Sequence, residues 1–156
     1  MKAIHSTYFF YGFTMVFILF VLFYTSQNAF FWDTVQLGSL QATFYYDSNF
    51  SHFLLPDRID SGHIPAFGMY IAFMWKLFGR TLLVSHLAML PFILCLFWQT
   101  HRLVSYFFKG NIRGIAFLLI LLDTCLLGQL TLISPDVVLI GLFLMAFNAI
   151  LRNQKL

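Results

Sequence analysis

The sequence predicts an all-α integral membrane protein, with about four transmembrane helices and one or two further helices at the membrane surface. Of its 156 residues, 60% are hydrophobic and 10% are charged, whereas soluble domains carry about a quarter charged residues. Apolar runs recur with lengths near the roughly 20 residues that a helix needs to cross a bilayer. The basic residues stand at the ends of these runs and form no patch, which argues against a nucleic-acid partner.

Four apolar runs in a single membrane domain, residues 1–156, are the predicted spans, at residues 8–25, 81–98, 115–133 and 136–151. The first run follows Met1 and Lys2 as a signal peptide would. Its apolar core is longer than that of a signal peptide, however, and residues 27–29 make a poor cleavage site, so an uncleaved signal anchor is favoured. Pro91 predicts a kink within the second span.

The distribution of charge predicts which side of the membrane each end of the spans faces. With a cytoplasmic N-terminus, most basic residues fall on the inner side, as the positive-inside rule requires. These residues are Lys2, Arg102, Lys109, Arg113, Arg152 and Lys155. All acidic residues are aspartates, and every one except Asp123 then falls on the outer side. We therefore expect the long segment of residues 26–80 to be an extracytoplasmic loop.

Two stretches of this outer loop predict helices that lie along the membrane surface. The stretch DTVQ, which begins at Asp33, has the pattern of a capping box, and apolar residues follow it at helical spacing as far as Phe44. Residues 64–79 are apolar but short for a span, and they contain Lys76. These properties suit a helix in the membrane interface.

Asp33, at the edge of the first span, is the foremost candidate for chemistry. A carboxylate at the start of a surface helix is held rigidly and is half desolvated, which suits a general base. The same position also suits a helix cap. Both roles remain open, because capping does not exclude catalysis.

The other outer candidates flank the second surface helix and the last span; they are Arg58, Asp60, His63, Lys76, Arg80 and Asp136. Asp60 and His63 belong to a turn-forming stretch, and for Arg58 we prefer a role as a charge that keeps a solvated loop soluble. Capping accounts for Asp136, since Pro-Asp is a common helix entry, but the topology brings this residue to the same membrane face as Asp33.

The aspartates and cysteines are the candidate residues for binding or conducting ions. The outer aspartates can hold a hard divalent cation, although no pattern demands one. Cys95 and Cys125 lie within apolar runs and predict neither a disulfide nor a metal site. Asp123 lies within the third predicted span, where we expect it to face the bundle interior. Its partner would be Gln129, the hydroxyl of Thr124 or Thr131, or a missing helix. A small transporter or ion-conducting protein would use such a carboxylate, but no basic partner accompanies it.

The order of these motifs resembles that of the GT-C membrane glycosyltransferases that use polyprenyl-phosphate sugars, in the branch of the protein mannosyltransferases and the lipid A aminoarabinose transferase. Members have an acidic motif after the first span, matched here by FWDTVQLGS, and then a surface helix. A D-x-x-HPP-L type motif follows, matched by DSGHIPAFGMYIAFMWKLFG with Ile64 at the second position, and LISPDVV matches an aspartate motif after span three. The likeness covers nearly the whole chain.

This resemblance implies a bacterial inner-membrane enzyme that transfers a sugar from a polyprenyl phosphate to an acceptor on the outer face. The transfer would invert the configuration of the anomeric carbon. Asp33 would be the base, and Asp136 would orient the acceptor or a metal ion. The remaining outer candidates would bind the donor and its leaving phosphate.

Enzymes of this family are several times longer, so the chain resembles their N-terminal portion, and a second chain is expected to supply further helices. The alternative is a non-catalytic membrane subunit, whose spans pack against partner helices and whose aspartates are caps and interface groups.

Overall fold

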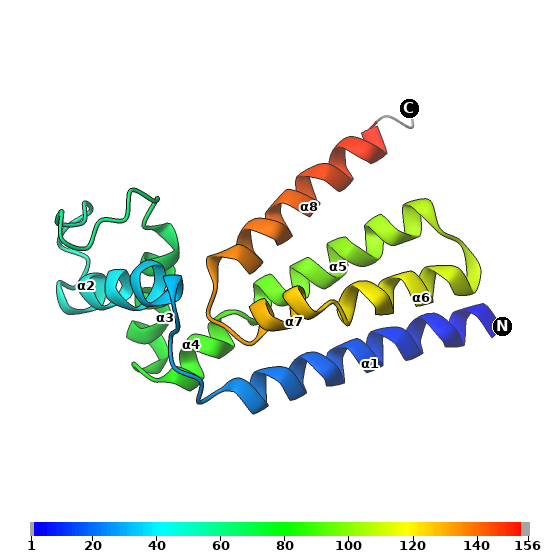
Figure 1. The fold of residues 1–156 in the computed structure, drawn as a ribbon, viewed down its shortest axis with the longest axis horizontal. Coiled ribbons are helices and arrows are strands. Elements are labelled where there is room, and N and C mark those ends of the chain that lie inside the picture. The colour runs from blue at the N-terminus through cyan, green and yellow to red at the C-terminus, as the bar shows by residue number, and fades with distance from the viewer. Residues whose placement is uncertain (1, 154–156) are drawn as a thin grey trace.

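The computed structural model describes residues 2–153, and it describes their side chains except those of residues 2–8, 10 and 11. The predicted inner cations Lys2 and Lys155 therefore lie outside the described side chains. The described residues form helices joined by connecting segments, with no strand among them (Figure 1). The all-α prediction is confirmed for this part of the chain.

The helices follow one another as α1 (Lys2–Thr25), the π-helical segment η1 (Val35–Leu40), α2 (Gln41–Asp47), α3 (Ala66–Phe78), α4 (Leu82–Ala88), α5 (Leu90–Phe107), α6 (Gly110–Leu121), α7 (Thr124–Leu130) and α8 (Pro135–Asn153). We call η1, α2 and α3 together the α2–α3 unit. The predicted surface helix at residues 64–79 corresponds to α3, and the one that follows Asp33 corresponds to η1 and α2.

Two helices are long and apolar enough to cross a membrane. One is α4 and α5 taken together, Leu82–Phe107, and the other is α8. Over Gly12–Thr25, α1 is apolar but shorter than a span. Helices α6 and α7 qualify only as a pair, which is bent by 60°. Among the described residues, the structure therefore offers two spans, or three if the bent pair counts as one.

The second predicted span, residues 81–98, covers only part of a longer helix. Helix α5 continues beyond Trp98 to Phe107, because Gln99 and Thr100 are buried in the bundle rather than exposed at a membrane surface. The break near Pro91 is present, since α4 ends at Ala88 and α5 begins at Leu90. Pro91 then lies in the first turn of α5, where its missing N–H leaves no helical hydrogen bond unmade.

The third predicted span is not continuous, and Asp123 explains the break. The carboxylate of Asp123 accepts a hydrogen bond from the N–H of Leu126 (2.9 Å), which caps α7 directly after α6 has ended. The Asp123 side chain is exposed. The expectation that it pairs with Gln129 or a threonine inside the bundle was wrong, because the freed backbone N–H groups at the break supply its partner.

The α2–α3 unit lies at one end of the helical bundle, where α1 ends and α7 connects to α8 (Figure 1). The N-terminus and the connection from α5 to α6 lie at the opposite end (Figure 1). Asp33 and Asp136, which the sequence predicts to share one membrane face, thus lie at the same end of the bundle.

The α2–α3 unit has a core of its own, built from close contact between two helices. Ala42 and Tyr45 of α2 and Ile71 and Ala72 of α3 have no exposed surface. A Cβ atom on Gly68 would lie 2.5 Å from the Cβ of Gln41, so α3 touches α2 at a point where only glycine fits.

Three hydrogen bonds join the unit and its flanking segments to α4. The Trp75 indole donates to the Ser85 hydroxyl (2.8 Å), and the Tyr70 hydroxyl donates to the carbonyl of Ala88 (2.7 Å). On α4 itself, His86 Nε2 lies 3.0 Å from the carbonyl of Asn28, in the segment that follows α1. These contacts fix the α2–α3 unit against the start of the Leu82–Phe107 helix.

Candidate functional site

Asp33 lies in the turn that connects α1 to the α2–α3 unit. Its side chain is exposed, and it makes no hydrogen bond or ion pair to another described residue. The structure shows no side-chain cap at the start of η1, so Asp33 does not fill the capping role that the DTVQ pattern predicts. The Thr34 hydroxyl accepts from the N–H of Phe31 (2.8 Å) and donates to the carbonyl of the same residue (2.7 Å). The Asp33 carboxylate is therefore left uncommitted.

The backbone next to Asp33 is strained. Trp32 has a φ of 53°, in the left-handed region that a bulky side chain rarely adopts. Such a conformation costs on the order of 1–3 kcal/mol, and residues that adopt it cluster at functional sites. Beyond Asp33, η1 is π-helical, a geometry that is also frequent at functional sites. The buried Thr34 hydroxyl holds this turn in place.

Asp60 and His63 share one tight turn. The Asp60 carboxylate accepts from the N–H of Gly62 (2.8 Å), and His63 Nδ1 lies 2.9 Å from the carbonyl of Ser61. Since a carbonyl only accepts, Nδ1 of His63 is the donor in this contact. The Ser61 hydroxyl accepts from the amide of Gln41 (3.2 Å), which attaches the turn to the start of α2.

Lys76 and Arg80 gather at the other end of α2. The Lys76 ammonium lies 4.4 Å from the centre of the Tyr46 ring. The Arg80 guanidinium lies 5.1 Å from the Trp75 ring, donates to the Thr43 hydroxyl (2.8 Å) and is 3.4 Å from the carboxylate of Asp47. Asp47 forms an ion pair with Arg80 alone among the described residues. Arg80 contacts α2 at Thr43 and Asp47, whereas Ser61 of the Asp60–His63 turn contacts it at Gln41.

Asp136 lies in the first turn of α8 and is exposed. The cap of this helix is Ser134, whose hydroxyl accepts from the N–H of Asp136 (3.2 Å). An acidic side chain in the first turn interacts favourably with the helix dipole. The Ser134 cap leaves the Asp136 carboxylate uncommitted.

The predicted site residues therefore form separate groups. The structure brings Asp60 together with His63, and Lys76 together with Arg80, whereas Asp33 and Asp136 contact neither group directly. Arg58 is exposed in the turn that follows Pro56. In the described part of the chain, no three histidine, cysteine or acidic side chains gather as they would around a metal ion.

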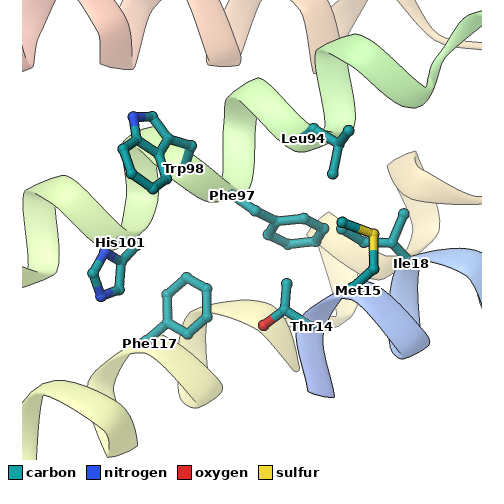
Figure 2. Close-up of a pocket in the computed structure, with 8 residues that line it drawn as sticks. All are labelled: Thr14, Met15, Ile18, Leu94, Phe97, Trp98, His101 and Phe117. Carbon is teal, nitrogen blue, oxygen red and sulfur yellow. The ribbon is translucent and has the colours of Figure 1, made fainter. Parts of the chain in front are cut away.

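A cavity of about 270 Å³ lies within the bundle, away from all of these residues. Figure 2 shows its walls, which come from α1, α5 and α6 and are almost entirely apolar; they are Thr14, Met15, Ile18, Leu94, Phe97, Trp98, His101 and Phe117. The Thr14 hydroxyl is buried and has no hydrogen-bond partner among the described residues. The cavity suits an apolar guest, and none of the predicted site residues lines it.

Sequence reasoning missed the residues that position the candidates. Thr34 closes the turn before η1, and Ser134 caps α8. Tyr46 and Trp75 lie against the cations. Each hydroxyl adjoins or nearly adjoins its aspartate in the sequence, so the hydroxyls were a usable signal. The aromatic partners were not, because their contacts join segments that are far apart in the sequence.

No protein-family model, curated protein or solved structure matches this chain.

Proposed function

We propose that the chain crosses a membrane through α1, through α4 and α5 together, through the bent α6–α7 pair and through α8. Helix α1 has 24 residues, which at 1.5 Å per residue extend about 36 Å, more than the roughly 30 Å of a hydrocarbon core. Broken helices persist at membrane depth where the freed backbone groups find partners, and Asp123 supplies one at the α6–α7 break. The α2–α3 unit then lies on the extracytoplasmic face of a bacterial inner membrane.

We further propose that this face carries out glycosyl transfer from a polyprenyl-phosphate sugar, as in the GT-C enzymes that the motifs resemble. The observation that carries the proposal is the exposed, uncommitted carboxylate of Asp33 in a strained turn next to a π-helical segment. A purely structural carboxylate at this position would be expected to cap the helix, but Asp33 makes no hydrogen bond to a described residue, and η1 begins without a side-chain cap.

In the proposed reaction, Asp33 takes the proton of the acceptor hydroxyl while the oxygen of that hydroxyl forms a bond to the anomeric carbon. The bond between this carbon and the phosphate oxygen breaks on the opposite face of the sugar. Its electron pair leaves with the polyprenyl phosphate, and the anomeric configuration inverts. Lys76 and Arg80, with only Asp47 to neutralise them, offer positive charge to the leaving phosphate. Asp136 and the Asp60–His63 turn offer acceptors for sugar hydroxyls.

The test measures the transfer of sugar from a labelled polyprenyl-phosphate sugar by membranes that contain the chain. Asp33→Asn keeps the shape of the side chain and removes the base, so we expect transfer to fall by about 10²–10⁴-fold. Asp57→Asn removes an exposed carboxylate of the same loop and is the matched control. Equal transfer by the Asp33→Asn membranes and the wild-type membranes would remove Asp33 from the reaction.

A second candidate function is that of a non-catalytic membrane subunit. Only 17% of the apolar window of α8 is buried, and Leu139, Phe143 and Ile150 expose large apolar surfaces on this helix. In a subunit, these side chains would contact the helices of a second chain. Cysteine crosslinking from position 143 that captures the same membrane protein in every preparation would favour this function, and crosslinking to lipid alone would count against it.

A further inference from the structure

A second cavity, of about 330 Å³, lies between α5 and α8 near their C-terminal ends. Its walls are Arg102, Ser105 and Tyr106 of α5 and Asn148, Leu151 and Arg152 of α8. Figure 1 shows these two helices diverging toward the C-terminal end of α8, at the end of the bundle opposite the α2–α3 unit. Unlike the cavity near Thr14, this one is lined mainly by polar and cationic side chains.

A buried polar contact forms the floor of this cavity. The Asn148 amide donates to both the backbone carbonyl (2.9 Å) and the side-chain oxygen (3.0 Å) of Gln99. Asn148 is 2% exposed, so the two helices are held tightly together here. Beyond this contact they separate, and Arg102 and Arg152 reach the space between them from opposite sides.

Within residues 2–153, which the structure describes, neither arginine has a counter-charge nearby. Among the described residues, the only ion pair joins Arg80 to Asp47, which lies in the α2–α3 unit. The chain has no glutamate, and its aspartates lie at the opposite end of the bundle or, for Asp123, at the α6–α7 break. Two guanidinium groups that share a cavity repel each other unless an anion lies between them. The planar donors of arginine match phosphate oxygens in a bidentate manner.

We propose that this cavity binds a phosphate group, held between Arg102 and Arg152. Arg102 lies about one and a half helical turns before the end of α5, the depth at which lipid headgroups meet protein, and basic pockets between helices bind anionic lipid headgroups. The phosphate belongs either to an anionic phospholipid or to a soluble phosphate compound. The two arginines would bind the phosphate group of either compound in the same way, and the experiment below distinguishes the two sources.

The test uses the purified chain in a neutral detergent, with two probes added separately: phosphatidylglycerol in mixed micelles and inorganic phosphate. Binding to the folded state raises the midpoint of thermal unfolding. We expect one of the probes to raise the midpoint for the wild-type chain, whereas phosphatidylcholine and chloride do not. Stabilisation by phosphatidylglycerol alone identifies a lipid ligand, and stabilisation by inorganic phosphate identifies a soluble one.

The decisive comparison is between variants that lose the same charge. Arg102→Gln with Arg152→Gln should weaken binding of the active probe at least about tenfold, because charge-assisted hydrogen bonds are lost. Lys109→Gln with Arg113→Gln removes two cations at the same end of the bundle but outside the cavity, and it should bind as the wild type does.

Arg152 is exposed near the end of α8, so Arg152→Gln alone carries the test if the double variant does not fold. Equal losses in the cavity variant and the control variant, or no stabilisation of the wild type by either probe, would overturn the proposal.

Discussion

Gly68→Ala tests the closest contact of the α2–α3 unit. The added Cβ would lie 2.5 Å from the Cβ of Gln41 and 3.2 Å from the backbone N of Ala42. Neither atom is the flexible end of a side chain, so α2 and α3 must move apart. Overpacking of this kind costs about 1–3 kcal/mol, and the helix propensity of alanine offsets up to about 1 kcal/mol of it. We expect the unit to lose about 1–2 kcal/mol of stability.

Hydrogen exchange measures this loss locally. A change of 1–2 kcal/mol corresponds to exchange that is roughly 5–30-fold faster at the amides of α3. The control is Gly128→Ala, another glycine within a helix, where a Cβ would meet no atom within 4 Å. This variant should leave exchange in α3 unchanged. If exchange in α3 is no faster in Gly68→Ala than in Gly128→Ala, the two helices do not pack as described.

Three further predictions concern capping, a buried contact and pH. Asp123→Ala should lower the free energy of unfolding by about 0.5–2 kcal/mol, because the cap of α7 is lost. Asp123→Asn should preserve the cap and the stability. An equal loss in both variants would show that the charge matters, not the cap. Alanine substitutions of Asn148 and Gln99 in a double-mutant cycle should give a coupling of about 0.6–1.7 kcal/mol, and strictly additive losses would refute their contact. Burial, aided by the charge of Asp60, raises the pKa of Tyr45. Above a pH of about 10, the unfolded state therefore releases a proton that the folded state retains, and the stability of the folded state should fall. Thermal unfolding of Tyr45→Phe should show a smaller fall over this range, and an identical fall would refute the assignment.

The existence of most helices could be predicted from the sequence. Apolar periodicity and a single lysine predicted a helix at residues 64–79, and α3 runs from Ala66 to Phe78. The last predicted span, at residues 136–151, likewise corresponds to α8, Pro135–Asn153. Both segments are apolar, and polar or turn-forming residues bound them, so local composition determines where they begin and end.

The breaks within predicted helices and the contacts between helices were harder to predict. Residues 115–133 are apolar throughout except for Asp123, and hydrophobicity alone does not distinguish a straight span from two helices bent by 60°. A carboxylate placed where a second helix can start was the available signal. The packing of α2 against α3 also left a trace, since Gly38 and Ala42, and likewise Gly68 and Ala72, repeat the spacing of small residues that lets helices approach closely.

The candidate site could be predicted only one residue at a time. Asp33 and Asp136 were correctly placed at helix starts. The capping pattern did not determine which side chain bonds to the backbone there, since Ser134 caps α8 and η1 has no side-chain cap. Lys76 and Arg80 were predicted to bind donor phosphate, which stays a prediction, but their positions over aromatic rings of α2 and α3 were not foreseen. Such contacts depend on tertiary structure, which spacing along the chain does not reveal.

The proposed activity and the proposed phosphate site both require the two ends of the bundle to face opposite sides of the membrane. Single cysteines at positions 57 and 109, in a chain whose Cys95 and Cys125 are replaced by alanine, test this directly with a maleimide that does not cross membranes. In intact cells, the account predicts labelling of Asp57→Cys and labelling of Lys109→Cys only after the membrane is permeabilised. Labelling of both positions in intact cells, or of position 109 alone, would contradict it.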